Sequence, residues 1–510
     1  MTGPPAARWD AVVVGSGVAG LAAAIEAAAG GRRVVVLEAE PAPGGASAIS
    51  TGGCCLAGTP LQARSGIRDD AGLALRDWRR AGGASADLAW ARRYLADSCA
   101  EVYTWCEELG LTWSELRLHE GNSVPRWHLP AGGGPAVVDA LLARCRSLGV
   151  TLRTGTAVTR ILRENGRARG VAATAAGESY HLLAGATIIC TGGFTSNRGL
   201  LLRHAPGLAG LSRFLCGGSA TATGRGHGLL RQAGAAFTGL DHLWLYPVGT
   251  PDPQDPSGAR GLVVRGIRDE IWVNSDGVRF HDEDLRGGLT GTPAVIAQPG
   301  QTAWGIFDRR AAAGLLLLND AHYGSPLLTA PDAQAQFWRE SRYAWRADSI
   351  PELAAATGLP PAALAGSLDR YNASIRAGGG REPEFGRPVP GLRPIAQPPF
   401  CAIQYFPLVQ KNLGGVRTDS GCRVQPAGGP AMTGLYAAGE VAGMAGGCIN
   451  GAGAIEGTMF GPCLYSGRVA GRAAARDSRI LTTLLTSTIR ASQRQPQWHD
   501  GVINCAGVAA

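Results

Sequence analysis

Three glycines near the N-terminus constrain the fold more than any other feature of the chain. Gly15, Gly17 and Gly20 form a GxGxxG pattern after the apolar run AVVV (11–14), and an alanine-rich stretch follows. This order of segments predicts a strand, a tight turn and a helix. In such a turn the first glycine permits a sharp bend, the second lets a pyrophosphate approach the backbone, and the third lets helix and strand pack closely. The pattern predicts a dinucleotide site.

An acidic residue follows the next apolar run. VVVL (34–37) predicts the second strand of a βαβ unit, and Glu38 comes directly after it. A carboxylate at this place can accept hydrogen bonds from the hydroxyl groups of an adenosine ribose. We therefore expect an unphosphorylated ribose rather than that of NADP, although the motif alone does not separate NAD from FAD.

The sequence pattern changes in the middle of the chain. From about residue 237, prolines, tryptophans and short alternating segments replace the smooth βαβ pattern, and strand-like runs return after Pro399. We predict a nucleotide-binding domain made of residues 1–236 and 399–478. A second domain at 237–398 interrupts it, and residues 479–510 form a C-terminal tail.

Composition excludes several classes of protein. The net charge of +8 is carried almost wholly by arginine, and no cluster of basic residues with interleaved aromatics predicts binding to nucleic acid. The twelve cysteines show no CxxC pair and no spacing for zinc or an iron–sulfur cluster, so we expect no metal. No apolar run approaches the length of a membrane span. We expect a cytoplasmic protein with reduced thiols.

Four further segments resemble a known family. PGGASAISTGG (43–53), TGG (191–193), LGGVRTD (413–419) and GLYAAGEVAG (434–443) are similar to segments of the fumarate reductase/3-ketosteroid dehydrogenase flavoproteins. The resemblance covers about residues 10–476. It implies an α/β fold, in which a smaller α+β capping domain interrupts a Rossmann-like FAD-binding domain.

The resemblance also implies the cofactor and its ligands. FAD is expected to be bound non-covalently, because Ala46 stands near the place where covalently flavinylated relatives have a histidine. Residues 453–455 are expected to open a helix whose N-terminal N–H groups stabilise the negative charge of the reduced flavin. The expected cofactor-binding residues are Gly15, Gly17, Val18, Ala19, Gly20, Glu38, Ala39, Gly44, Gly45, Ala46, Ser47, Ser50, Thr51, Gly52, Gly53, Val158, Thr191, Gly192, Gly439, Glu440, Gly453, Ala454 and Ile455.

The ligands of a dicarboxylate substrate are absent. Relatives specific for dicarboxylates carry an HGxNRxGG-like segment, and here AGGCINGAGAIEG (445–457) has Gly451 where its arginine is expected. Tyr246 stands in place of one family histidine, and Gln410 or Lys411 in place of another. The loss of all three ligands argues against fumarate or succinate as the substrate.

The GAGA part of the same segment resembles that of 3-ketosteroid dehydrogenases, although Ile449 and Asn450 fill the place of their tyrosine. A steroid dehydrogenase that forms another double bond, or an enzyme acting on another cyclic ketone or specialised metabolite, fits equally well. The substrate therefore stays open between these classes.

Three residues are the catalytic candidates. Arg286 lies near the position of the proton-donating arginine in the resembling fumarate reductases. Lys411 is the only lysine of the chain, and a titratable ammonium near a flavin is a reason to retain one. Tyr246 is a candidate for binding or enolising a carbonyl; His281 and Tyr405 are weaker candidates of the same kind.

The predicted function is an FAD-dependent oxidoreductase acting on CH–CH groups. It transfers hydride between flavin and the carbon β to a ketone or acid, with a small-molecule substrate and an electron carrier that the sequence does not identify. Two alternatives stay open: an oxidase or tailoring enzyme that uses oxygen, and a non-catalytic flavin-binding scaffold or electron-transfer subunit.

Overall fold

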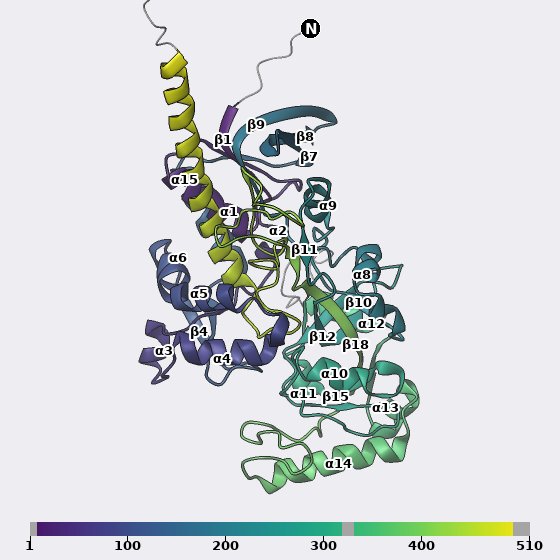
Figure 1. The fold of residues 1–510 in the computed structure, drawn as a ribbon. Helices are drawn as coiled ribbons and strands as arrows, with labels where there is room; N and C mark the ends of the chain where they lie inside the picture. The colour runs from purple at the N-terminus through teal and green to yellow at the C-terminus, as the bar shows by residue number, and fades with distance from the viewer. Residues whose placement is uncertain (1–7, 319–330, 493–510) are drawn as a thin grey trace, which may run out of the picture.

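Two β-sheets organise the molecule, one in each of two domains (Figure 1). The computed structural model describes residues 8–318 and 331–492. Within these residues no helix is both long and apolar enough to cross a membrane. They also hold no group of three or more His, Cys, Asp or Glu side chains that could bind a metal ion.

The first domain is built on a seven-stranded sheet in the order β6-β2-β1-β9-β8-β7, with β20 also paired to β9. Strands β6, β2, β1, β9 and β20 run parallel, whereas β7, β8 and the first half of the long β9 form an antiparallel meander. The predicted βαβ unit is confirmed as β1, α1 and β2. The strands are β1 (Arg8–Val14), β2 (Val34–Leu37), β6 (Thr151–Arg153), β7 (Thr156–Glu164), β8 (Arg167–Ala175), β9 (Glu178–Ile189) and β20 (Leu435–Ala437).

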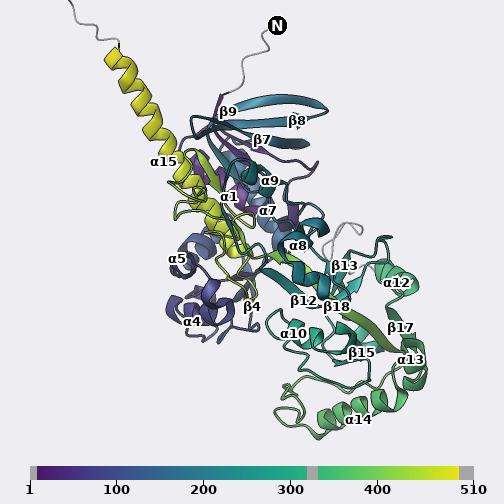
Figure 2. The same cartoon turned by 45° about the vertical axis from the view of Figure 1, so that its right-hand side comes forward.

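Helix α15 lies against α1 and extends beyond the body of the domain (Figures 1 and 2). Small residues permit this close packing: a Cβ added at Gly467 would overlap Ala19 O, and one added at Gly471 would overlap Ala23 O. The helices of this domain are α1 (Val18–Ala29), α2 (Gly45–Ala48), α7 (Gly133–Ser147), α9 (Arg225–Gln232) and α15 (Phe460–Ser492).

An excursion between α2 and α7 carries a three-stranded sheet, β3-β5-β4, and several helices. The buried Arg126 guanidinium bonds to Asp69 at 2.7 Å and also to Asp77, which ties α4 and the loop before it to the start of β5. Its elements are β3 (Cys54–Cys55), α3 (Pro60–Arg64), α4 (Ala71–Gly82), η1 (Gly83–Ser85), α5 (Leu88–Ser98), the π-helical η2 (Cys99–Thr104), α6 (Trp105–Glu108), β4 (Trp113–Arg117) and β5 (Trp127–Pro130).

The second domain is built on an eight-stranded sheet in the order β14-β15-β18-β12-β13-β16, with β10 and β17 also paired to β18. Strand β18 is its longest strand, and it lies beyond the predicted domain boundary at residue 398. Along the chain, the last strand of this sheet therefore extends to Asn412. Its strands are β10 (Leu215–Cys216), β12 (Leu243–Pro251), β13 (Gly261–Arg265), β14 (Glu270–Val273), β15 (Ala303–Asp308), β16 (Leu316–Leu318), β17 (Ala344–Ala347) and β18 (Phe400–Asn412).

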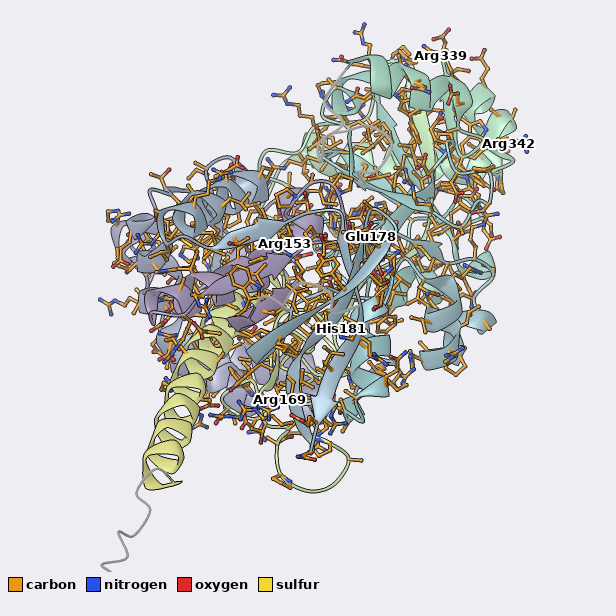
Figure 3. All side chains as sticks on the ribbon, turned by 90° about the horizontal axis from the view of Figure 1, so that it is seen from above. Arg153, Arg169, Glu178, His181, Arg339 and Arg342 are labelled. Atoms are coloured by element: carbon orange, nitrogen blue, oxygen red, sulfur yellow. The ribbon has the colours of Figure 1, made fainter. Side chains whose placement is uncertain are left out.

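Helices cover this second sheet, and α14 forms the far end of the domain (Figure 1). Seen from above, Arg169 on β8 and Arg339 on α12 lie at opposite ends of the molecule (Figure 3). The remaining elements are α8 (Arg198–His204), η3 (Pro206–Gly210), β11 (Phe237–Thr238), α10 (Gly291–Ile296), η4 (Pro299–Gln301), α11 (Arg309–Ala312), α12 (Pro331–Glu340), α13 (Ile350–Thr357), α14 (Pro361–Ala377) and β19 (Gly415–Val416).

The expected α/β fold, with an interrupted Rossmann-like domain, is confirmed. Two local expectations differ from the structure. Helix α15 begins at Phe460, after a turn closed by the bond from Thr458 N to Ile455 O, so residues 453–455 do not open it. The same helix continues to Ser492, into the segment expected to be a tail, and residues 493–510 lie outside the described part of the chain.

Candidate functional site

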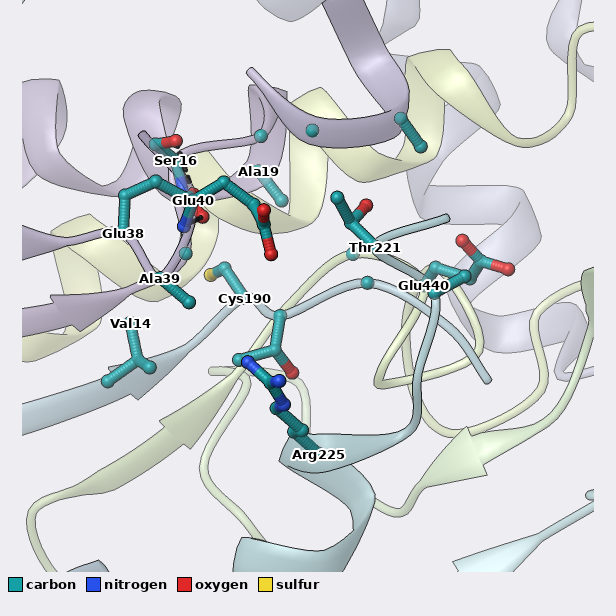
Figure 4. A pocket seen from close by; sticks show the side chains of 18 of the residues that line it. Val14, Ser16, Ala19, Glu38, Ala39, Glu40, Cys190, Thr221, Arg225 and Glu440 are labelled. Carbon is teal, nitrogen blue, oxygen red and sulfur yellow. Dashed lines mark hydrogen bonds between the residues drawn. The ribbon is translucent and has the colours of Figure 1, made fainter. Parts of the chain in front are cut away.

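A cavity lies at the carboxyl ends of β1, β2 and β9 (Figure 4). Residues 14–19, 37–40 and 190–193 supply three of its walls, and residues 221–223 supply another. Nucleotides bind at this edge of an open parallel sheet because tight turns and helix N-termini meet there.

Most of the predicted cofactor ligands meet in this cavity. The first turn of α1 faces it, and Ser47 Oγ accepts a hydrogen bond from Val18 N at 3.2 Å, which joins α1 to the segment 43–53. The predicted residues that line the cavity are Gly15, Gly17, Val18, Ala19, Glu38, Ala39, Gly45, Ala46, Ser47, Val158, Thr191, Gly192, Gly439 and Glu440.

Glu38 lies at one end of the cavity and is held in place by its neighbours. Its carboxylate accepts hydrogen bonds from Ser16 N at 2.9 Å, Ser16 Oγ at 2.5 Å and Glu40 N at 2.9 Å, the first two drawn in Figure 4. Ser16 Oγ in turn accepts from Gly44 N at 3.0 Å. Ser16 thus links the two glycine segments, a role that the sequence pattern did not reveal because the residue between the two glycines varies freely in the motif.

Glu440 lies at the other end, and burial raises its pKa to about 7. Glu440 Oε1 accepts from Asn412 N at 3.2 Å, and the Asn412 amide nitrogen donates to Glu440 O at 3.1 Å. Asn412 Oδ1 also accepts from Phe194 N at 3.1 Å. The last residue of β18 therefore fixes the second sheet to the wall of the cavity.

These groups fit the parts of FAD. The N-terminus of α1 offers N–H groups to a pyrophosphate. Thr191 Oγ1 is buried in the wall without a hydrogen-bond partner, as expected of a group that a ligand satisfies. The residue after it, Gly192, has a φ of 72° and no atom within 4 Å of an added Cβ. Its backbone is therefore accessible from the cavity. The Glu38 carboxylate is of the kind that accepts from a ribose.

The sequence did not predict Thr221, Thr223 and Arg225, which also line the cavity. Arg225 begins α9 and points toward the cavity opposite Glu40 (Figure 4). Glycines at 224, 226 and 228 surround this arginine and were a usable signal, but they lay outside the segments of the resemblance.

Several predicted ligands lie outside the cavity. Gly44 contacts Ser16, and Gly20 packs against Gly15 O. Residues 50–53 lie against α7 and Trp127, whereas Gly453 packs against Ala81 and Leu289. The predicted residues outside the cavity wall are Gly20, Gly44, Ser50, Thr51, Gly52, Gly53, Gly453, Ala454 and Ile455.

Tyr246 and Lys411 come together beside the wall that contains Glu440. Lys411 Nζ lies 5.7 Å from the centroid of the Tyr246 ring, and the Arg265 guanidinium lies 4.3 Å from it. Tyr246 Oη donates to Glu456 Oε1 at 2.7 Å. Burial lowers the pKa of Lys411, and its charge interacts with both Glu456 and Glu440. Glu456, in the GAGAIEG segment, was not among the candidates.

Arg286 belongs to a neighbouring network. Its guanidinium donates to Glu283 O at 2.8 Å, Ile267 O at 3.0 Å and Glu270 Oε1 at 2.9 Å. Tyr405 Oη donates to the other oxygen of Glu270 at 2.8 Å. A role of Arg286 as a proton donor stays a prediction.

The weaker candidate His281 has an ordinary packing role. It stacks on Trp272, and its Nε2 lies 2.8 Å from Leu285 O. Cys448 is buried with its Sγ 3.4 Å from His242 Nδ1, and burial raises its thiol pKa to about 11.

Comparison with known proteins agrees with this geometry. The model of the FAD binding domain family matches residues 10–455. A KsdD-like steroid dehydrogenase of Mycobacterium tuberculosis is 32% identical over 553 aligned residues, with 92% of this chain and 96% of that protein covered. The probable fumarate reductase Ifc3 of Shewanella frigidimarina is 28% identical, with 92% of this chain and 76% of that protein covered.

A solved structure gives the same result. The 3-ketosteroid-Δ4-(5α)-dehydrogenase of Rhodococcus jostii RHA1, in complex with 4-androstene-3,17-dione, is 26% identical with a TM-score of 0.68, and the match covers 92% of this chain and 97% of that one. The predicted cofactor and family are therefore confirmed. The chain belongs to the FAD binding domain family, and it is an FAD-dependent oxidoreductase of the fumarate reductase and ketosteroid dehydrogenase type that acts on CH–CH groups.

Proposed function

We propose that this enzyme introduces or reduces the carbon–carbon double bond next to the carbonyl of an uncharged cyclic ketone, and that it does not act on fumarate. The similarity to proteins named as steroid dehydrogenases supports a ketone of steroid-like size. The direction of the reaction and the electron carrier are left open by this proposal.

The main support for this proposal is the backbone conformation and packing of Gly451. Gly451 stands where the resemblance expects a carboxylate-binding arginine, and its φ is 71°. A Cβ added there would overlap Gly82 O and lie 2.6 Å from Ala86 N. A side chain of any size is therefore excluded by the packing against the turn after α4. A substrate carboxylate has no partner from this position, whereas a ketone oxygen needs none.

The chain's own groups suit a ketone. Bound FAD supplies a hydride donor or acceptor for the β-carbon. Lys411 and Arg265, which lie over the Tyr246 ring, supply positive charges that would stabilise negative charge developing on an enolate oxygen. At the domain border Glu120 Oε2 accepts from Gly287 N at 2.9 Å, which joins the two domains at this point.

The test is an anaerobic half-reaction. The purified enzyme is reduced and then mixed with 4-androstene-3,17-dione, 2-cyclohexenone or fumarate while flavin absorbance near 450 nm is followed. We expect an enone to reoxidise the flavin at least about 100-fold faster than fumarate, since a missing charge partner costs about 3 kcal/mol or more.

A saturated 3-ketosteroid mixed with the oxidised enzyme tests the reverse direction. Bleaching of the flavin would support the same proposal with the reaction running as a dehydrogenation. Reoxidation by fumarate at a rate equal to that of the enones would contradict the proposal, as would a failure of every ketone in both directions.

A further inference from the structure

Tyr246 and Glu456 meet across the border between the two domains. Tyr246 lies on β12 of the second sheet, and Glu456 lies in the turn that precedes α15 of the first domain. The phenol donates to Glu456 Oε1 at 2.7 Å. The other carboxylate oxygen, Oε2, has no hydrogen bond in the described part of the chain and is not buried. Glu456 thus binds the phenol through one carboxylate oxygen and keeps the other free of hydrogen bonds to the described residues.

Positive and titratable groups from three elements lie near Tyr246 and Glu456. Arg265 on β13 lies over the Tyr246 ring, and Lys411 on β18 lies on the same ring at 5.7 Å. Burial lowers the pKa of His119, on the turn between β4 and β5, and the charge of Glu456 acts in the opposite direction. Within residues 8–318 and 331–492, no Lys or Arg nitrogen lies within 4.0 Å of Glu456. The carboxylate is therefore held near cations without being neutralised by a direct ion pair.

Burial makes it costly for the phenol to hold a negative charge. It raises the pKa of Tyr246 far above the usual value for a tyrosine, and the carboxylate beside it adds to this effect. A phenolate formed here would be unstable, so a proton taken up by Tyr246 oxygen has to be matched by one that leaves it. The hydrogen bond to Glu456 provides the path for that proton.

We propose that Glu456 is the proton acceptor behind Tyr246 in the reaction on the ketone, which rests on the function proposed above. In the oxidative direction the C–H bond at the α-carbon breaks and its proton passes to Tyr246 oxygen. The phenolic proton passes at the same time to Glu456, whose carboxylate becomes a carboxylic acid. The electron pair of the C–H bond stays on the substrate as the enolate, and bound FAD would supply the acceptor for the hydride of the β-carbon. Reduction of an enone follows the same steps in reverse.

The decisive variant is Glu456→Gln. Its amide oxygen can still accept the hydrogen bond from Tyr246, so this contact between the two domains is kept. The amide cannot take up a proton. We expect the half-reaction to slow by about 10²–10⁴-fold, while the dissociation constant for the ketone, read from the flavin spectrum, changes less than about threefold. Glu456→Asp should recover part of the rate.

A comparison of single and double variants separates this role from a structural one. Tyr246→Phe should slow the reaction as much as Glu456→Gln, and the double variant should be no slower than either single variant because the two residues act in one path.

Glu120→Gln is the matched control, since Glu120 also accepts a hydrogen bond across the domain border. Because Glu120 takes no part in the proposed proton transfer, this variant should keep a rate within about threefold of the wild-type rate. A Glu456→Gln variant as fast as the wild type, or an equal loss in Glu120→Gln, would overturn this inference. A wild-type enzyme that reacts with no ketone would instead overturn the proposed function.

Discussion

Replacing Gly15 with alanine is expected to yield protein without bound FAD and to lower the free energy of unfolding by about 3–5 kcal/mol. Gly15 has a φ of 101°, a region that L-residues with a side chain avoid. A Cβ added there would overlap Cys190 O and lie 2.9 Å from Cys190 C. Because both atoms are backbone at the end of β9, no rotamer change can relieve the overlap, and β1 would have to separate from β9.

The same movement would open the FAD cavity, which Gly15 and Cys190 both line. Two measurements check this prediction: the ratio of absorbance at 450 and 280 nm after purification, and urea unfolding followed by tryptophan fluorescence. Gly31→Ala is the matched control, since Gly31 has a φ of 79° but no atom within 4 Å of an added Cβ. It should lose about 1–2 kcal/mol and keep its flavin. A flavin-replete Gly15→Ala as stable as Gly31→Ala would show that the close approach to Cys190 is dispensable.

The side of the FAD cavity formed by β1, α1 and β2 could be predicted from sequence because its determinants are local. The bend at Gly15, the start of α1 and the acid after β2 all lie within residues 11–38, where the periodicity of apolar residues and the glycine spacing act together. Glu38 accordingly lies in the cavity wall as expected.

The substrate side could not be predicted in the same way, because its contacts join distant segments. Tyr246 and Glu456 are 210 positions apart, and only the pairing of β12 with β18 and the turn before α15 bring them together. The run 400–412, just beyond the boundary predicted at residue 398, was hard to place for a related reason. The run 400–412 is apolar enough for either domain, and its place is decided by the pairing of β18 with β12 and β15.

A buried ion network in the second domain leads to the other large effect. Glu283 is completely buried and accepts from Arg279 Nε at 2.7 Å, Arg387 Nη1 at 3.1 Å and Trp272 N at 3.0 Å. Glu283→Gln keeps the size of the side chain but leaves two buried guanidinium groups short of negative charge. The new amide NH₂ would also face donors. We expect a loss of about 3–5 kcal/mol in the free energy of unfolding, because breaking a buried pair from one side leaves an uncompensated charge.

This loss should lower the midpoint of thermal unfolding by about 6–20 °C, measured by circular dichroism, while FAD stays bound at 25 °C because its cavity lies in the first domain. The control is Glu164→Gln, whose ion pair with Arg169 at 2.9 Å is exposed on both sides. It should change stability by less than about 1 kcal/mol, since water screens such a pair. If the two variants were equally stable, the arginines around Glu283 would have to be neutralised by Glu382 and Asp284 instead, which bond to Arg279 at 3.2 Å and to Arg387 at 2.9 Å. The network would then be redundant, and Glu283 would serve to orient β14 through Trp272 N rather than to balance charge.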